Sequence, residues 1–248
     1  MTHLDKTDKT TLAGLYIAKF DQAALSALGF GRMRQAFNVL GYSLGSSPAS
    51  IKNYRDEFDR LFPENPRQGW QRTLKTRSAK LYSLYGSLDF ESFTELVKGF
   101  LIPGYEYEKT ANSATDCETV NESVARRLMT GKAAEAYFVK TYREVPEFDG
   151  YDCMDTTNFA CGFDFKLSLA SNCYCVEVKG LSLFAGRITL TEKEYNVAAT
   201  LRAKYCLFVV KNFSEHPCHQ LYFDPLSSDL TFQQKERLVK QIDYTAQV

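Results

Sequence analysis

The chain has 248 residues, and its 30 Lys and Arg side chains balance its 30 Asp and Glu, so it carries no net charge. A hydrophobic content of 44% excludes a disordered chain, and the length suits one large domain or two small ones. No apolar run reaches about 18 residues and the N-terminus is polar, so no signal peptide or membrane span is indicated. Seven cysteines without paired CxxC spacing are typical of a reducing compartment. We therefore expect a cytoplasmic protein with no membrane partner.

Residues 12–101 are predicted to be helical. Apolar side chains recur at helical spacing in residues 21–42, which predicts one helix there. A stretch with two glycines and a proline, 41–50, then breaks the pattern, and a second helix is predicted over 50–62. Two further helices are predicted, over 72–86 and 87–101.

The helix, short break and helix form the outline of a helix-turn-helix DNA reader, although two helices of an ordinary bundle give the same pattern. Residues 31–80 favour the DNA reader because ten basic side chains stand there against four acidic ones, a net charge of +6. A solvated helical surface is the alternative explanation. If the second helix enters the major groove, its first turns contact DNA, and Tyr54 and Phe58 belong to the core. The predicted DNA-binding residues are Ser50, Lys52, Asn53 and Arg55.

A change of pattern near residues 102–115 predicts a boundary between a basic helical domain, 1–115, and a second domain, 116–248. The second domain should contain a long helix, two strands joined by a turn of Ala170, Ser171 and Asn172, and a helix opened by the capping box of Thr191 and Glu194. A buried strand and a terminal helix over 231–244 follow. We therefore expect an α/β protein in which an all-helical N-terminal domain precedes a mixed sheet flanked by helices.

The second of the two strands, NCYCVEVKG at 172–180, carries charged side chains in an otherwise apolar run. Because side chains alternate between the faces of a strand, Glu177 and Lys179 share a face. If the strands pair through the short turn, the numbers of paired residues sum to about 342, which places Asp164 across from residue 178. Two carboxylates so close repel each other unless a cation joins them, and Mg²⁺ selects oxygen ligands of this kind. A solvent-exposed hairpin with an incidental Asp…Glu-x-Lys pattern is the alternative.

Asp164 followed by Glu177-x-Lys179 resembles the core of the PD-(D/E)xK nucleases. Residues 118–226 are similar to one branch, the NO VEIN C-terminal domain family, through GKAAEAYFV, GFDF, CVEVKG and LTEKEYNVAATLRAKYCLFVV. The resemblance implies a restriction-endonuclease-like core in which Asp164 and Glu177 bind Mg²⁺, with Mn²⁺ as a substitute, and Lys179 is catalytic. It also implies a helical catalytic acid, for which Glu135 is the match; a helix-surface carboxylate is the alternative there. No proline precedes Asp164 and aromatic residues flank it, but neither departure from the family removes a ligand.

We expect a Mg²⁺-dependent deoxyribonuclease that cuts double-stranded DNA, of a type II-like restriction kind, with recognition by the helical domain. Cutting both strands needs two sites, which favours a homodimer, and a cognate methyltransferase would accompany such an enzyme. One alternative is a non-catalytic DNA-binding protein that uses the nuclease fold as a scaffold. Another is a structure-specific or RNA-directed nuclease, although A-form RNA closes its major groove to a reading helix.

Overall fold

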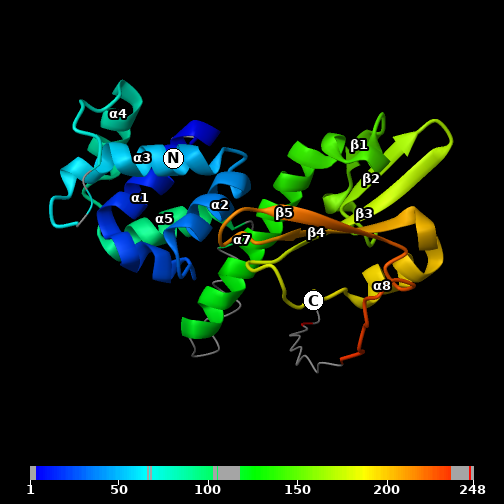
Figure 1. The fold of residues 1–248 in the computed structure, drawn as a ribbon. Coiled ribbons are helices and arrows are strands. Elements are labelled where there is room, and N and C mark those ends of the chain that lie inside the picture. The colour runs from blue at the N-terminus through cyan, green and yellow to red at the C-terminus, as the bar shows by residue number, and fades with distance from the viewer. Residues whose placement is uncertain are drawn as a thin grey trace.

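The computed structural model describes residues 4–65, 67, 69–102, 105, 118–235 and 246. Its class is the predicted one: helices form the N-terminal region, and a mixed five-stranded sheet with helices follows in the described residues (Figure 1). The predicted domain boundary, between residues 115 and 116, lies outside the described residues. None of the helices in the described part is both long and apolar enough to cross a membrane.

The N-terminal region contains α1 (Lys6–Ala27), α2 (Met33–Ser43), α3 (Pro48–Phe58), α4 (Thr76–Tyr85) and α5 (Phe90–Leu101). The single helix predicted over 21–42 is wrong, because α1 ends and α2 begins within that range. Gly29 lies between the two helices with a φ of 75°, a left-handed conformation that ends a helix and that glycine adopts readily. Periodicity alone missed this break because apolar side chains continue on both sides of it.

The predicted outline of helix, short break and helix is present as α2, the turn 44–47 and α3. Ser47 caps α3, since its Oγ accepts the N–H of Ser50 at 3.1 Å, and Pro48 occupies the first turn. Phe58 is fully buried, as predicted, whereas Tyr54 is only partly buried. α3 therefore packs through one face and leaves another face to solvent.

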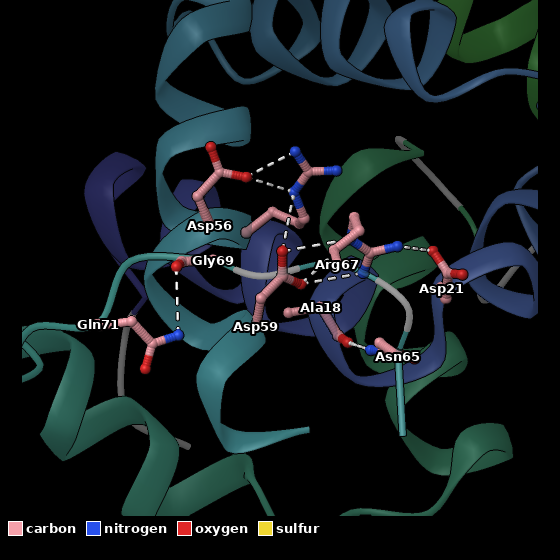
Figure 2. A network of polar contacts seen from close by, with 9 residues as sticks. Ala18, Asp21, Asp56, Asp59, Asn65, Arg67, Gly69 and Gln71 are labelled. Atoms are coloured by element: carbon pink, nitrogen blue, oxygen red, sulfur yellow. Dashed lines mark hydrogen bonds and ion pairs between the residues drawn. The ribbon is translucent and has the colours of Figure 1, made fainter. Parts of the chain in front are cut away.

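The segment that follows α3 is fixed to α1 by a polar network (Figure 2). The guanidinium of Arg67 pairs with Asp59, at 3.0 Å, and with Asp21 of α1. The side-chain amide of Asn65 donates to the carbonyl of Ala18, also in α1. Asp59 is almost fully buried, so it faces this network rather than solvent. Asp59 thus offsets the charge of a guanidinium inside the helical region.

The sheet has the strand order β1-β2-β3-β4-β5 in the described residues. Neighbouring strands are antiparallel except for β3 and β4, which are parallel and are connected through α8 (Glu192–Leu201). The strands are β1 (Asp152–Asp155), β2 (Phe165–Leu169), β3 (Asn172–Gly180), β4 (Tyr205–Lys211) and β5 (Cys218–Phe223). The sequence analysis did not predict the edge strands β1 and β5, whose side chains are largely exposed or half-buried. In the terminal helix predicted over 231–244, residues 231–235 have no regular structure and 236–244 lie outside the described residues.

Helix α7 (Glu118–Thr141) lies between the N-terminal helices and the sheet (Figure 1). On the sheet side, the ring of Phe138 lies 4.8 Å from that of Phe165 and 5.0 Å from that of Phe208, measured between centroids. On the other side, the hydroxyl of Ser43 in α2 donates to the carbonyl of Met129 at 3.0 Å. Buried residues from α1 through β4 form one continuous hydrophobic cluster.

Candidate active site

The β2–β3 hairpin has a register one residue different from the prediction. Leu169 pairs with Asn172 and Phe165 pairs with Val176, so the turn contains two residues rather than three. Ala170, the first of them, has a φ of 51°, the left-handed value that the first position of a tight two-residue hairpin turn requires. Ala lacks the usual preference for that conformation, which is why the turn could not be recognised from the sequence.

Asp164 directly precedes β2 and bonds to β3, since its N–H donates to the carbonyl of Val176 at 3.0 Å. Glu177 and Lys179 share a face of β3 because side chains alternate along a strand, and the charge of Asp164 acts on the Glu177 carboxyl. Oδ2 of Asp164 accepts the backbone N–H of Val178 at 2.9 Å, which fixes the orientation of that carboxylate. The predicted juxtaposition of Asp, Glu and Lys is therefore present, through a different register.

The two faces of β3 have different neighbours. Val176 and Val178 belong to the large hydrophobic cluster beneath α7. Glu177 and Lys179 alternate with them and point to the opposite face, where Cys175 and Tyr205 pack against Ala198 of α8. The charged pair thus lies in a sheet face partly covered by a helix and not on a solvated hairpin, which removes the alternative of an incidental surface pattern.

Glu177 is only 3% exposed, and this burial raises the pKa of its carboxyl to about 8. The Lys179 ammonium, whose Nζ lies 2.5 Å from Oε1 of Glu177, opposes that rise, and Asp164 adds to it. Burial also raises the pKa of Asp164, against the effect of the Val178 N–H. For Lys179, burial works to lower the pKa, but the nearby acids outweigh it and raise the pKa. The site therefore concentrates carboxylates in a poorly solvated place, which protonation or a nearby cation offsets.

Glu135 reaches the same site from α7. Gly180 allows the close approach of that helix, because a Cβ at this position would lie 2.8 Å from the carbonyl oxygen of Thr130 and 3.1 Å from Cβ of Ala134. Burial, followed by the negative charges of Asp164 and Asp155, raises the pKa of Glu135 to about 7. This environment differs from that of a solvated helix-surface carboxylate, so Glu135 belongs with the acids of β2 and β3.

The sequence analysis missed Glu194 as a site residue. Its Oε2 lies 3.0 Å from Nζ of Lys179, and the same oxygen accepts the backbone N–H of Thr191 at 2.8 Å. The Thr-x-x-Glu pattern did predict the helix start, which the structure confirms as a capping box. The capping role is sufficient to explain a glutamate at this position, so nothing in the sequence indicated that Glu194 also contacts Lys179.

The carboxylates of the candidate site limit which metal ion it could hold. Among the described residues, no group of three or more His, Cys, Asp and Glu side chains is arranged to hold a metal. A closed site of the zinc type is therefore absent from the part of the chain that the structure describes. Mg²⁺ binds through one or two carboxylates and completes its shell with water and substrate phosphates. Asp164 and Glu177 fit that requirement.

The structure separates the four predicted DNA-binding residues. Lys52 and Asn53 are exposed on α3, and Ser50 is half-buried, with its hydroxyl 2.9 Å from that of Ser47. The prediction for Arg55 is wrong, because this residue is only 8% exposed. Its guanidinium lies 2.6 Å from Asp56 Oδ1. The physical reason is helical spacing, which places residue 55 on the inward face that carries Ile51 and Phe58.

Residues 134–223 match the family described as Protein NO VEIN, C-terminal. The matched segment contains Glu135, Asp164, Glu177, Lys179 and Glu194, together with the whole sheet. It excludes the N-terminal helices α1 to α5. A search of curated proteins and a search of solved structures found no match to the chain.

Proposed function

We propose that this protein is a Mg²⁺-dependent endonuclease of the PD-(D/E)xK type that hydrolyses phosphodiester bonds of double-stranded DNA. The observation that carries the proposal is the hydrogen bond from the Val178 N–H to Asp164, which holds this acid beside β3, where Glu177 and Lys179 form an ion pair on one face. Burying two acids beside each other is unfavourable for the free protein, as the raised pKa values of both show. A cation-dependent reaction gives that arrangement a purpose.

Each side chain then has a definite task. Mg²⁺ held by Asp164 and Glu177 would polarise a phosphoryl oxygen and lower the pKa of a bound water. The Lys179 ammonium donates hydrogen bonds to the phosphate as negative charge develops on its oxygens. The Val178 N–H holds the Asp164 carboxylate in place, and Glu135, with a pKa of about 7, can exchange a proton near neutral pH. The chain therefore supplies metal ligands, a cationic hydrogen-bond donor and a group that takes or gives a proton.

The helical region supports a polyanionic substrate. Two of the four acids that lower the formal charge of residues 31–80, Glu57 and Asp59, are almost fully buried, whereas Glu64 is exposed. Asp59 pairs with Arg67, while the exposed side chains of Lys52 and Lys80 point outward from α3 and α4. Lys52 and Lys80 give the outward surface of α3 and α4 a positive charge, as expected of a surface that follows a phosphate backbone. We propose that it positions the duplex, with Asn53 beside Lys52 as a reader of base edges.

The test is incubation of the full chain with mixed-sequence duplex DNA in Mg²⁺ or in EDTA, followed by sequencing of the newly formed ends. We expect new ends only with Mg²⁺, and ends that share a sequence if the helical region recognises a site. The Asp164→Asn variant is the matched control, because the amide retains an oxygen that accepts the Val178 N–H but loses the anionic ligand.

Ends that form equally with Asp164→Asn, or equally in EDTA, would come from a contaminating nuclease and contradict the site assignment. Cleavage of single-stranded or structured RNA in preference to duplex DNA would replace the substrate and retain the chemistry. Tight DNA binding with no cleavage in Mg²⁺ or Mn²⁺ would favour a scaffold role for the fold.

A further inference from the structure

The ammonium of Lys179 is held between two carboxylates from different elements. Its Nζ lies 2.5 Å from Oε1 of Glu177 in the same strand and 3.0 Å from Oε2 of Glu194 in α8. Glu177 is also the carboxylate to which the proposed function assigns a divalent cation. A lysine ammonium and a metal ion therefore compete for one carboxylate, and a metal bound at Glu177 Oε1 would displace the ammonium from that oxygen.

Glu194 is a fixed partner rather than a mobile surface acid. The N–H of Thr191 and the ammonium of Lys179 both donate to its Oε2, while the Glu194 N–H donates to the Thr191 hydroxyl at 3.2 Å. Helix α8 packs closely against the segment that precedes Asp164, because Gly162 has no side chain and Val197 Cγ2 approaches to 2.8 Å of where a Cβ would be. The position of this carboxylate is thus determined by the helix cap.

We infer that Glu194 is a positioning residue that retains the Lys179 ammonium when a divalent cation takes the Glu177 carboxylate. With Glu194 present, Lys179 can leave Glu177 and still keep an anionic partner beside the phosphate. Without it, Glu177 is the stronger of the remaining partners for the ammonium, which then obstructs the metal. This inference rests on the proposed function, because it needs a cation at Glu177.

The inference predicts a particular pattern in metal affinity. Glu194→Gln should weaken Mg²⁺ binding by about tenfold, a coupling of ordinary size for residues in contact. Lys179→Met removes the competing ammonium and should strengthen Mg²⁺ binding. In the Lys179→Met background, Glu194→Gln should have no further effect, because the ammonium through which it acts is gone. If Glu194 attracted the metal by its charge alone, Glu194→Gln would instead weaken Mg²⁺ binding equally in both backgrounds.

The experiment is isothermal titration of the full chain with Mg²⁺, and with Ca²⁺ as a second probe, in the absence of DNA. The proteins are the wild type, Glu194→Gln, Lys179→Met, the double variant and Thr191→Ala. Thr191→Ala is the control for the helix cap: it removes the hydroxyl that accepts from Glu194 but keeps the backbone N–H that holds the Glu194 carboxylate. It should bind Mg²⁺ like the wild type. Thermal unfolding of each variant checks folding, and Lys179→Gln replaces Lys179→Met if the latter does not fold.

The outcomes separate the two proposals. No binding of either cation to the wild type would overturn the proposed function and this inference together. Binding to the wild type with unchanged affinity in Glu194→Gln would overturn the inference alone. Equal weakening by Glu194→Gln in both backgrounds, or equal weakening by Thr191→Ala, would also overturn it, since the effect would then come from charge or from the helix cap.

Discussion

Replacing Glu177 with Gln should stabilise the metal-free protein while it abolishes cleavage. Burial raises the pKa of this carboxyl from its ordinary 4.5 to about 8. Below pH 4.5 the group is protonated in both folded and unfolded chains, so it adds no pH dependence. Between pH 4.5 and 8 only the unfolded chain has lost the proton, and stability therefore falls as the pH rises. Above pH 8 the group is ionised in both states and the full penalty is present.

The size of the effect follows from the same values. Full ionisation in the folded chain is unfavourable by about 5 kcal/mol, and roughly 2 kcal/mol of this develops between pH 6 and pH 8. Two kcal/mol corresponds to a change of about 6 °C in the unfolding temperature of a chain of this length. The wild type should lose that much more than Glu177→Gln between the two pH values. Glu135 titrates in both proteins, so the difference between them isolates Glu177.

The assay is thermal and urea unfolding in EDTA at pH 6, 7 and 8 for both proteins. Added Mg²⁺ should restore stability to the wild type at pH 8 and stabilise Glu177→Gln much less, because that variant keeps only Asp164 of the two carboxylate ligands. Parallel pH profiles of the two proteins would refute the reasoning, since Glu177 would then be an ordinary carboxylate. A less stable Glu177→Gln protein at pH 8 would show that the ion pair with Lys179 outweighs burial.

Lys179→Ala should lower the rate of cleavage by about a hundredfold at saturating DNA, because it removes a contact to the developing phosphate charge. A rate unchanged at saturation, with weaker DNA binding, would instead make Lys179 a phosphate anchor. Lys52→Ala should weaken binding to all duplexes and reduce the salt dependence by about one ion, which filter binding at several salt concentrations would show. Asp59→Ala should destabilise the helical region by about 3 kcal/mol in urea unfolding, because it leaves Arg55 and Arg67 short of their buried partner, and its Mg²⁺ affinity should match the wild type.

The acids of the candidate site could be found from the sequence because strand alternation and an Asp…Glu-x-Lys pattern are local signals. Their exact pairing could not, since it depended on a two-residue turn in which Ala170 adopts a positive φ. Glu194 was invisible for a related reason. Its backbone role in the cap is a local pattern, whereas its contact with Lys179 depends on how α8 docks on the sheet.

Arg55 shows the opposite failure. A basic residue near the start of a predicted reading helix suggested an exposed contact, but charge type does not determine which face a residue occupies. The helical period places it with Ile51 and Phe58, and three neighbours satisfy it there: Asp56, Asp59 and the ring of Phe37. An arginine with such partners can be buried within the apolar face of a helix. A single basic residue in an apolar helical pattern is therefore weak support for an exposed, DNA-contacting side chain.

Helix α7 connects the two parts of the proposed reaction. One side of it packs against α2, which precedes the proposed reading helix α3, and the other packs against β3 and carries Glu135 toward the site. A second connection runs from Asn38 of α2, whose amide donates to the carbonyl of Phe213 at 2.8 Å, directly after β4. Because these contacts lie in one continuous core, α2 cannot shift relative to the sheet without moving α7 or the segment at residue 213. The distance between the proposed DNA-reading surface and the acids is therefore set by the packed core, which is how a fixed offset between a recognised sequence and a cut phosphate would be maintained.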